Sequence, residues 1–177
     1  NNRIKNTNKL IIESSKYKIK QTSTKHKGNA IFIVGMPRSG STLVESIICM
    51  NEKVSDLGKT NIFNESFNDW IRSLDQSKNI DLEELYFRKT NQITNNSKIT
   101  TNKMLYNYQY SGIICSQISN AKIIHCFRNP LDNILSIYRA NFTKGNKYSS
   151  SLIDCAKIYL NQVEVMEIYK RKFHSKI

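Results

Sequence analysis

Two short apolar runs stand out in an otherwise polar chain. Residues 30–34 are continuously apolar and residues 121–127 are mostly so, with polar residues on either side of both runs. This pattern is typical of strands buried in a parallel sheet. Apolar residues at helical spacing follow each run, over residues 43–48 and 131–138. Strands that alternate with helices predict an α/β fold in which helices flank a parallel sheet.

The rest of the chain carries the pattern of further helices and one more strand. Apolar residues recur at helical intervals in four segments, which are residues 63–74, 81–88, 108–118 and 152–166. Ser151 and Asp154 form a capping box in front of the last of them. Residues 99–105 predict a short strand that ends near Lys103, whereas residues 51–61 are polar and predict a connection.

The composition indicates a globular chain with one main domain. Its 177 residues are 39% hydrophobic and 23% charged, which is enough apolar material for one core. The start of the chain is polar and basic. We therefore place a lead-in, or the end of a preceding domain, at residues 1–28 and the main domain at residues 29–177. No apolar run has the length of a membrane span, and no signal peptide is visible.

The charge and the cysteine content of the chain indicate which binding partners and which cellular compartment to expect. A net charge of +13 favours anionic partners such as nucleotides, acidic peptides, nucleic acid or a membrane surface. A nucleic-acid interface would need clustered basic residues among exposed aromatic ones, and the sequence has no such cluster. The four cysteines lack zinc spacing and have apolar neighbours. They predict buried free thiols, no metal site and a reducing, cytoplasmic compartment.

The segment after the first apolar run carries the strongest functional signal. Residues 35–42, Gly-Met-Pro-Arg-Ser-Gly-Ser-Thr, have the spacing of the phosphate-binding loop (P-loop) G-x-x-x-x-G-K-[ST], with Ser41 in place of the lysine. Such a loop cradles a phosphate-like anion with backbone N–H groups and a helix N-terminus. The missing lysine normally contacts the β- and γ-phosphates. With Arg38 inside the loop instead, the segment predicts an anion other than a triphosphate; a P-loop kinase or hydrolase is the alternative.

A second strand–turn–helix unit supplies another candidate anion site. Arg128 follows the second apolar run, and Ser136 lies two turns into the helix after it. Asn129 and Pro130 suit the start of that helix. Because open α/β sheets bind ligands at the carboxyl edge, we expect Arg128 and Ser136 to meet there and to grip a phosphate monoester. The alternative is that Arg128 forms a surface ion pair with Asp132.

These two segments resemble the donor-binding motifs of sulfotransferases. Val-Gly-Met-Pro-Arg-Ser-Gly-Ser-Thr-Leu resembles the 5′-phosphosulfate loop of that family. Ala-Lys-Ile-Ile-His-Cys-Phe-Arg-Asn-Pro-Leu-Asp-Asn-Ile-Leu-Ser resembles its 3′-phosphate motif, with the family's eight-residue interval from Arg128 to Ser136. The resemblance covers residues 30–170. Within the family, the chain looks most like the protein-tyrosine sulfotransferase-like domains that follow tetratricopeptide repeats in bacteria.

The resemblance implies a sulfotransferase domain with the fold of P-loop-containing nucleoside triphosphate hydrolases, here truncated at its C-terminal end. It implies 3′-phosphoadenosine 5′-phosphosulfate (PAPS) as donor and sulfuryl transfer to a hydroxyl, with protein tyrosine as a candidate acceptor. The basic charge would suit an acidic peptide or an anionic glycan as acceptor. No metal is expected, because the sequence has no acidic metal-binding strand end and Arg38 supplies the charge of the loop. Arg128 and Ser136 would hold the 3′-phosphate. Arg38 and Lys103 would act on the leaving phosphate, because Lys103, in Thr-Asn-Lys-Met-Leu, matches a lysine near the bridging oxygen. The 5′-phosphosulfate would be held by Pro37, Arg38, Ser39, Gly40, Ser41 and Thr42.

One position departs from the tyrosine sulfotransferase-like branch. That branch carries a glutamate base next to a glycine, whereas Val-Ser-Asp-Leu-Gly-Lys-Thr-Asn places Lys59 there. A protonated lysine cannot accept the proton of the acceptor hydroxyl. Either Glu65 or Asp56 then serves as the base, or the chain is a PAPS-binding homologue with impaired catalysis.

Overall fold

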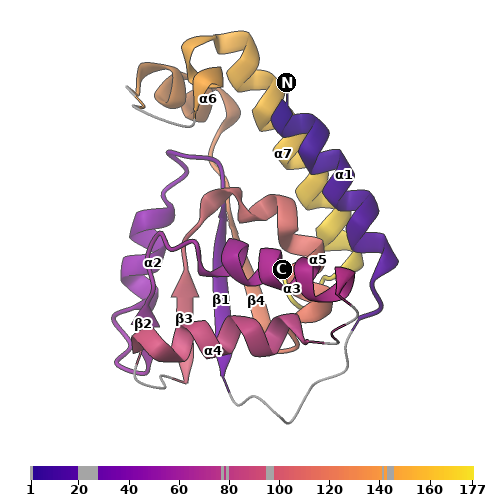
Figure 1. Ribbon diagram of the computed structural model, residues 1–177. Coiled ribbons are helices and arrows are strands. Elements are labelled where there is room, and N and C mark those ends of the chain that lie inside the picture. The colour runs from indigo at the N-terminus through magenta and orange to yellow at the C-terminus, as the bar shows by residue number, and fades with distance from the viewer. Residues whose placement is uncertain are drawn as a thin grey trace.

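A parallel sheet forms the centre of the protein. The computed structural model describes residues 2–19, 28–76, 78, 80–94, 98–140, 142 and 146–177. Within these residues the sheet has four strands in the order β2-β3-β1-β4 (Figure 1). The strands are β1 (Asn29–Gly35), β2 (Val54–Asp56), β3 (Ile99–Asn102) and β4 (Ala121–Cys126). All neighbouring pairs are parallel, which confirms the predicted α/β fold.

Strand β2 corrects the prediction for residues 51–61, which the sequence assigned to a connection. Val54 lies opposite Ile99 of β3 in parallel register. The strand has three residues, only one of them apolar, and it lies at the edge of the sheet. An edge strand of this kind lacks the continuous apolar run that marks a strand buried on both faces.

Helices surround the sheet. They are α1 (Asn2–Lys16), α2 (Ser41–Ile48), α3 (Ile62–Asp75), α4 (Leu82–Thr94), α5 (Ser111–Gln117), α6 (Pro130–Arg139) and α7 (Leu152–Lys172), with 3-10 helices η1 (Leu105–Tyr110) and η2 (Lys147–Ser150). Helices α3 and α4 lie side by side across one face of the sheet, and α1 and α7 run together along one side of the molecule (Figure 1). The region predicted as a helix over residues 108–118 begins as the 3-10 helix η1. None of the helices in the described ranges is both long and apolar enough to cross a bilayer.

Two apolar clusters hold these elements together. In the main cluster the fully buried ring of Phe32 on β1 meets Phe63 on α3 and Tyr86 on α4, with centroid distances of 5.6 Å and 5.3 Å. Burial of each such ring stabilises the fold by about 1.5–3 kcal/mol. A smaller cluster joins Met36, directly after β1, to Ile137 on α6. The second cluster therefore holds the segment after β1 and helix α6 next to each other.

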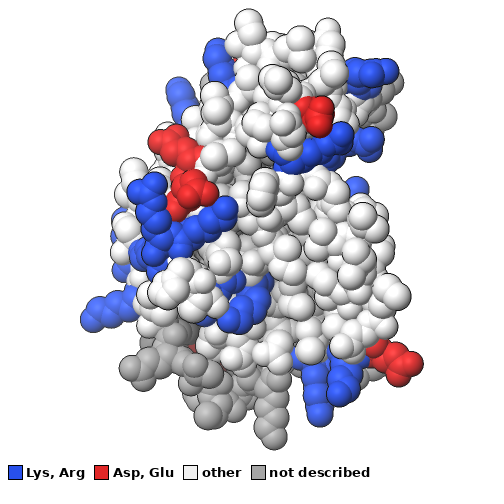
Figure 2. Space-filling model, turned by 180° about the vertical axis from the view of Figure 1, so that it is seen from behind, with Lys and Arg blue, Asp and Glu red and all other residues white. Residues whose placement is uncertain are grey.

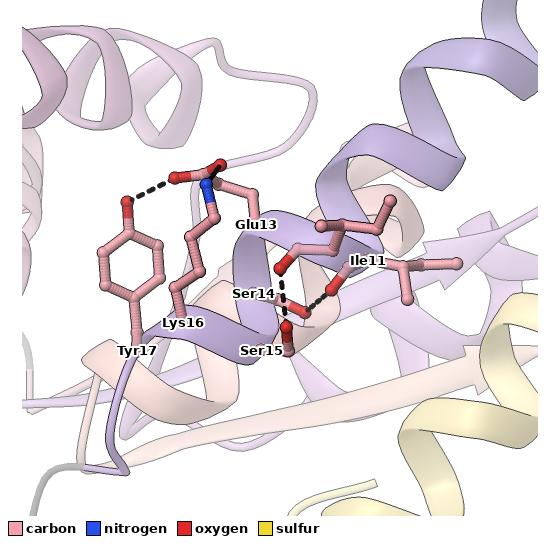
Figure 3. A network of polar contacts seen from close by, with 7 residues as sticks. Ile11, Glu13, Ser14, Ser15, Lys16 and Tyr17 are labelled. Atoms are coloured by element: carbon pink, nitrogen blue, oxygen red, sulfur yellow. Dashed lines mark hydrogen bonds and ion pairs between the residues drawn. The ribbon is translucent and has the colours of Figure 1, made fainter.

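Helix α1 packs on the same core as the main domain. It contacts η1, α5 and α7, and its last turn is tied by Glu13, which accepts hydrogen bonds from Lys16 at 3.0 Å and Tyr17 at 2.9 Å (Figure 3). The ring of Tyr17 lies 4.9 Å from that of Trp70 on α3. The segment predicted as a polar lead-in thus contributes a packed helix, and the rest of it, residues 20–27, lies outside the described residues. The domain boundary at residue 28 stays a prediction.

Candidate functional site

The loop between β1 and α2 lies at the carboxyl edge of the sheet, and a glycine shapes each of its ends. Gly35 has a φ of 145°, and a Cβ at this position would collide with the carbonyl oxygen of Cys126 at the end of β4. Only glycine allows the backbones to approach so closely. Gly40 has a φ of 90° directly before Ser41, the first residue of α2. The free N–H groups at the start of α2 therefore lie beside the loop and favour an anion there.

Arg38 connects this loop to helix α6. Its φ of 66° lies in the left-handed region, which no other non-glycine residue adopts in the described part of the chain. Such strain persists only where the surroundings hold it, and it clusters at ligand sites. The Nε of Arg38 donates a hydrogen bond of 3.2 Å to the Oγ of Ser136. The two predicted anion-binding motifs, far apart in the sequence, therefore meet.

Two asparagines stabilise helix α6. Asn129 caps its start, and Asn133 binds it to the loop. The side chain of Asn129 accepts hydrogen bonds from the amides of Leu131 at 3.0 Å and Asp132 at 3.3 Å, which confirms the predicted cap. The fully buried Asn133 donates from Nδ2 to the carbonyl oxygen of Pro37 at 2.9 Å. Sequence reasoning missed Asn133; its signal is an amide side chain beside the apolar stripe of α6. The loop is thus held by a buried hydrogen bond as well as by Arg38.

Two cavities open beside the loop and share two arginines. The first has a volume of about 420 Å³ and the second about 370 Å³, and Arg38 and Arg128 line both. The first is also lined by Pro37, Gly40, Ser41, Thr42 and Lys59, and the second by Asp132, Ser136 and Arg139. Seen from behind, Lys and Arg side chains gather at the rim of a hollow between the α6 end of the molecule and the body that holds the sheet (Figure 2). The structure thus brings most of the predicted donor-binding residues together around two adjoining cavities.

Arg128 presents its side chain to both cavities while its backbone is anchored. The hydroxyl of Tyr159 on α7 donates to the carbonyl oxygen of Arg128 at 2.8 Å. Among the residues that the structure describes, Arg128 and Asp132 form no ion pair with each other. The alternative explanation for Arg128, a surface ion pair with Asp132, is therefore not what the structure contains.

Lys103 lies beneath α2 and lines neither cavity. Its Nζ forms an ion pair with Glu45 on α2, and the two side chains are only 10% and 4% exposed. The Oγ1 of Thr101 donates to the other carboxylate oxygen of Glu45 at 3.2 Å. Sequence reasoning missed Glu45, whose signal is a single acidic residue in the otherwise mostly apolar segment Leu-Val-Glu-Ser-Ile-Ile. The placement of Lys103 near a bridging oxygen stays a prediction.

The residues considered for proton transfer lie in different places. Lys59 lines the first cavity. Asp56 accepts a hydrogen bond from the amide of Gly58 and lines neither cavity. Glu65, on α3, forms an ion pair with Lys89 at 3.6 Å and also lines neither cavity. The structure thus brings a cation, and not the predicted base Glu65, to the cavity.

His125 and the four cysteines are titratable residues that line neither cavity. His125 on β4 contacts Gln162, and burial lowers the pKa of its imidazole to about 4. All four cysteines are free, and three are buried as predicted, whereas Cys49 is half-buried. Burial raises the pKa of the Cys115 thiol to about 12. Over the described ranges, no three or more His, Cys, Asp or Glu side chains come together as a metal site.

The fold and the site define a class of protein, a parallel α/β domain with a glycine-framed anion loop after its first strand and a second arginine-lined cavity at the same edge. The profile of the sulfotransferase family matches residues 30–176, which is most of the chain. The chain belongs to the sulfotransferase family. Its parallel sheet flanked by helices agrees with the predicted sulfotransferase version of the P-loop fold.

The chain is also similar to an uncharacterized protein of Aquifex aeolicus (strain VF5). The two are 29% identical over an alignment of 129 residues that covers 63% of this chain and 17% of that protein. The matched part is thus a small share of the relative's length. Because that protein is uncharacterized, the similarity adds no activity. The tyrosine-specific branch and the tetratricopeptide-repeat parent stay predictions.

Proposed function

We propose that this chain binds PAPS and transfers its sulfuryl group to a hydroxyl acceptor. The observation that carries the proposal is the pair of cavities that share Arg38 and Arg128. PAPS carries anionic groups on the 5′ and 3′ oxygens of one ribose, so it needs two adjoining anion sites. A nucleotide without a 3′-phosphate would use only the cavity beside the P-loop.

The residues at the site fit such a donor. The first amides of α2 and the loop residues would hold the 5′-phosphosulfate. The Oγ of Ser39 is buried without a hydrogen-bond partner among the described residues, so it is available to donate to an anionic oxygen. Arg128 and Ser136 would hold the 3′-phosphate, since a guanidinium and a hydroxyl suit a phosphate monoester.

The transfer itself would depend mainly on positioning and positive charge. The acceptor oxygen forms a bond to sulfur while the bond from sulfur to the 5′-phosphate oxygen breaks. The hydroxyl proton passes to a base, and 3′-phosphoadenosine 5′-phosphate (PAP) leaves. Arg38 would stabilise the negative charge that grows on the leaving phosphate, and Lys103 would join it by exchanging its ion pair with Glu45 for the phosphate.

The acceptor is proposed from the charge of the chain. A net charge of +13 favours a hydroxyl on an anionic molecule, such as a tyrosine in an acidic peptide or a sugar in an anionic glycan. The nucleotide donor is the other partner, and nucleic acid is not expected. The cytoplasmic location stays a prediction.

Titration calorimetry with PAP, AMP and ATP tests the donor. We expect the chain to bind PAP at least tenfold more tightly than AMP or ATP, because the charge-assisted contacts of the second cavity are worth about 1.5–3 kcal/mol. Arg128→Ala should remove most of this preference. Equal affinity for PAP and AMP would contradict the proposal, and a preference for ATP would favour a P-loop kinase instead.

Sulfuryl transfer should not depend on a divalent metal. The proposed charge on the leaving phosphate comes from Arg38 and Lys103, so chelation removes nothing that the reaction needs. Transfer assayed with EDTA should equal transfer assayed with added magnesium. Loss of transfer in EDTA and recovery with magnesium would show that a metal supplies part of that charge.

A further inference from the structure

The second cavity holds more positive charge than the two predicted 3′-phosphate residues provide. Three guanidinium groups line it, those of Arg38, Arg128 and Arg139, and one carboxylate, that of Asp132. Two positive charges among the lining residues are therefore uncompensated. A phosphate monoester carries about −1.5 to −2 charge at neutral pH, whereas a phosphate diester or a sulfate ester carries about one negative charge. Arg38 and Arg128 also line the first cavity, so Arg139 is the one arginine among these lining residues that lies at the second cavity alone.

Arg139 is placed to complete this cavity. It is the last residue of α6 and lies one turn beyond Ser136, so both side chains lie on the same side of the helix. Its side chain is exposed and forms no ion pair with any residue within the described ranges, so it is available to a ligand. A cation at the end of a helix also gains from the helix dipole. That gain explains a charge at this position, but it does not explain why the cavity gathers three arginines.

We propose that Arg139 is a specificity-determining residue that binds the 3′-phosphate of the donor, an inference that rests on the proposed function. The guanidinium forks of Arg128 and Arg139 grip the monoester from two sides. Ser136 donates its hydroxyl proton, and its Oγ keeps the hydrogen bond from Arg38. Arg139 thus distinguishes donors with a 3′-phosphate from nucleotides that lack it.

Calorimetry with PAP and AMP on three single variants tests this role. Arg139→Gln removes the charge, Arg139→Lys keeps the charge without the fork, and Arg171→Gln is the matched control. Arg171 is an exposed arginine in the last turn of α7 and lines neither cavity. Far-UV circular dichroism and the thermal midpoint verify that every variant is folded.

We expect Arg139→Gln to weaken PAP binding about ten- to hundred-fold while AMP binding changes less than twofold. Arg139→Lys should lie in between, and Arg171→Gln should match the native chain. The role is overturned if Arg139→Gln binds PAP as the control does, or if it loses PAP and AMP affinity equally. If instead the native chain binds PAP and AMP alike, the donor assignment itself fails and the cavity is not a 3′-phosphate site.

Discussion

Glu45→Ala is expected to lower the free energy of unfolding by about 3–5 kcal/mol, which is among the largest effects of any single substitution in this chain. The substitution removes the carboxylate partner of Lys103, whose side chain is only 10% exposed. It also removes the acceptor for Thr101. Urea denaturation followed by circular dichroism, with linear extrapolation to water, measures the change.

The exposed pair of Lys170 and Glu167 is the matched control. Its atoms are 3.1 Å apart, and its side chains are 35% and 50% exposed. Glu167→Ala should therefore cost about 0.5 kcal/mol or less. If Glu45→Ala costs no more than this control, then the buried pair does not hold α2 to the end of β3.

The double variant Glu45→Met with Lys103→Met separates stability from function. Replacing both partners of a buried pair with apolar residues is often neutral or stabilises by about 1–4 kcal/mol. We therefore expect this variant to fold at least as well as either single variant. It should nevertheless lose sulfuryl transfer if Lys103 acts on the leaving phosphate. A folded double variant with native transfer would leave the pair a purely structural role.

The elements around the loop were predictable because their signals are local. Strand β1 lies inside the sheet and is mostly buried, and β4 pairs with it along its whole length, so both appear in the sequence as continuous or nearly continuous apolar runs. The loop was predictable because the backbone requires glycine at Gly35 and Gly40. Strand β2 has no such signal, because a three-residue edge strand depends on pairing with β3 rather than on its own composition.

Several site residues were not predictable because their roles depend on segments far apart in the chain. Glu45 takes its partner from β3, and Asn133 binds a carbonyl in the loop after β1. Arg139 became a candidate only when the cavity was found to hold two other arginines. The opposite holds for Glu65, a candidate from the sequence that lines neither cavity. It lies close to Lys59 in the sequence, but the structure pairs it with helix α4.

Substitution of Lys59 tests the proposed proton transfer most directly. It lines the first cavity, at the position where the resemblance implies a glutamate base. A lysine ammonium group has no lone pair with which to take the acceptor's proton. The cation still favours an anionic donor. The structure is thus compatible with retained donor binding and slow transfer.

Lys59→Glu should therefore restore a proton acceptor, and Lys59→Gln is its matched control because both variants remove the cation and differ only in the carboxylate. At saturating donor, we expect Lys59→Glu to transfer sulfuryl about 10²–10⁴-fold faster than Lys59→Gln, which is the usual contribution of general-base catalysis. Both variants should bind PAP more weakly than the native chain, because a positive charge has left the cavity. The measurement is single-turnover transfer from labelled PAPS to an acidic tyrosine peptide, with PAP binding followed in parallel.

If the native chain turns over readily and Lys59→Glu is no faster than Lys59→Gln, then Lys59 does not mark a lost base. The proton would then have to pass to Asp56, to Glu65 or to a residue outside residues 1–177, and Asp56→Asn and Glu65→Gln test the first two.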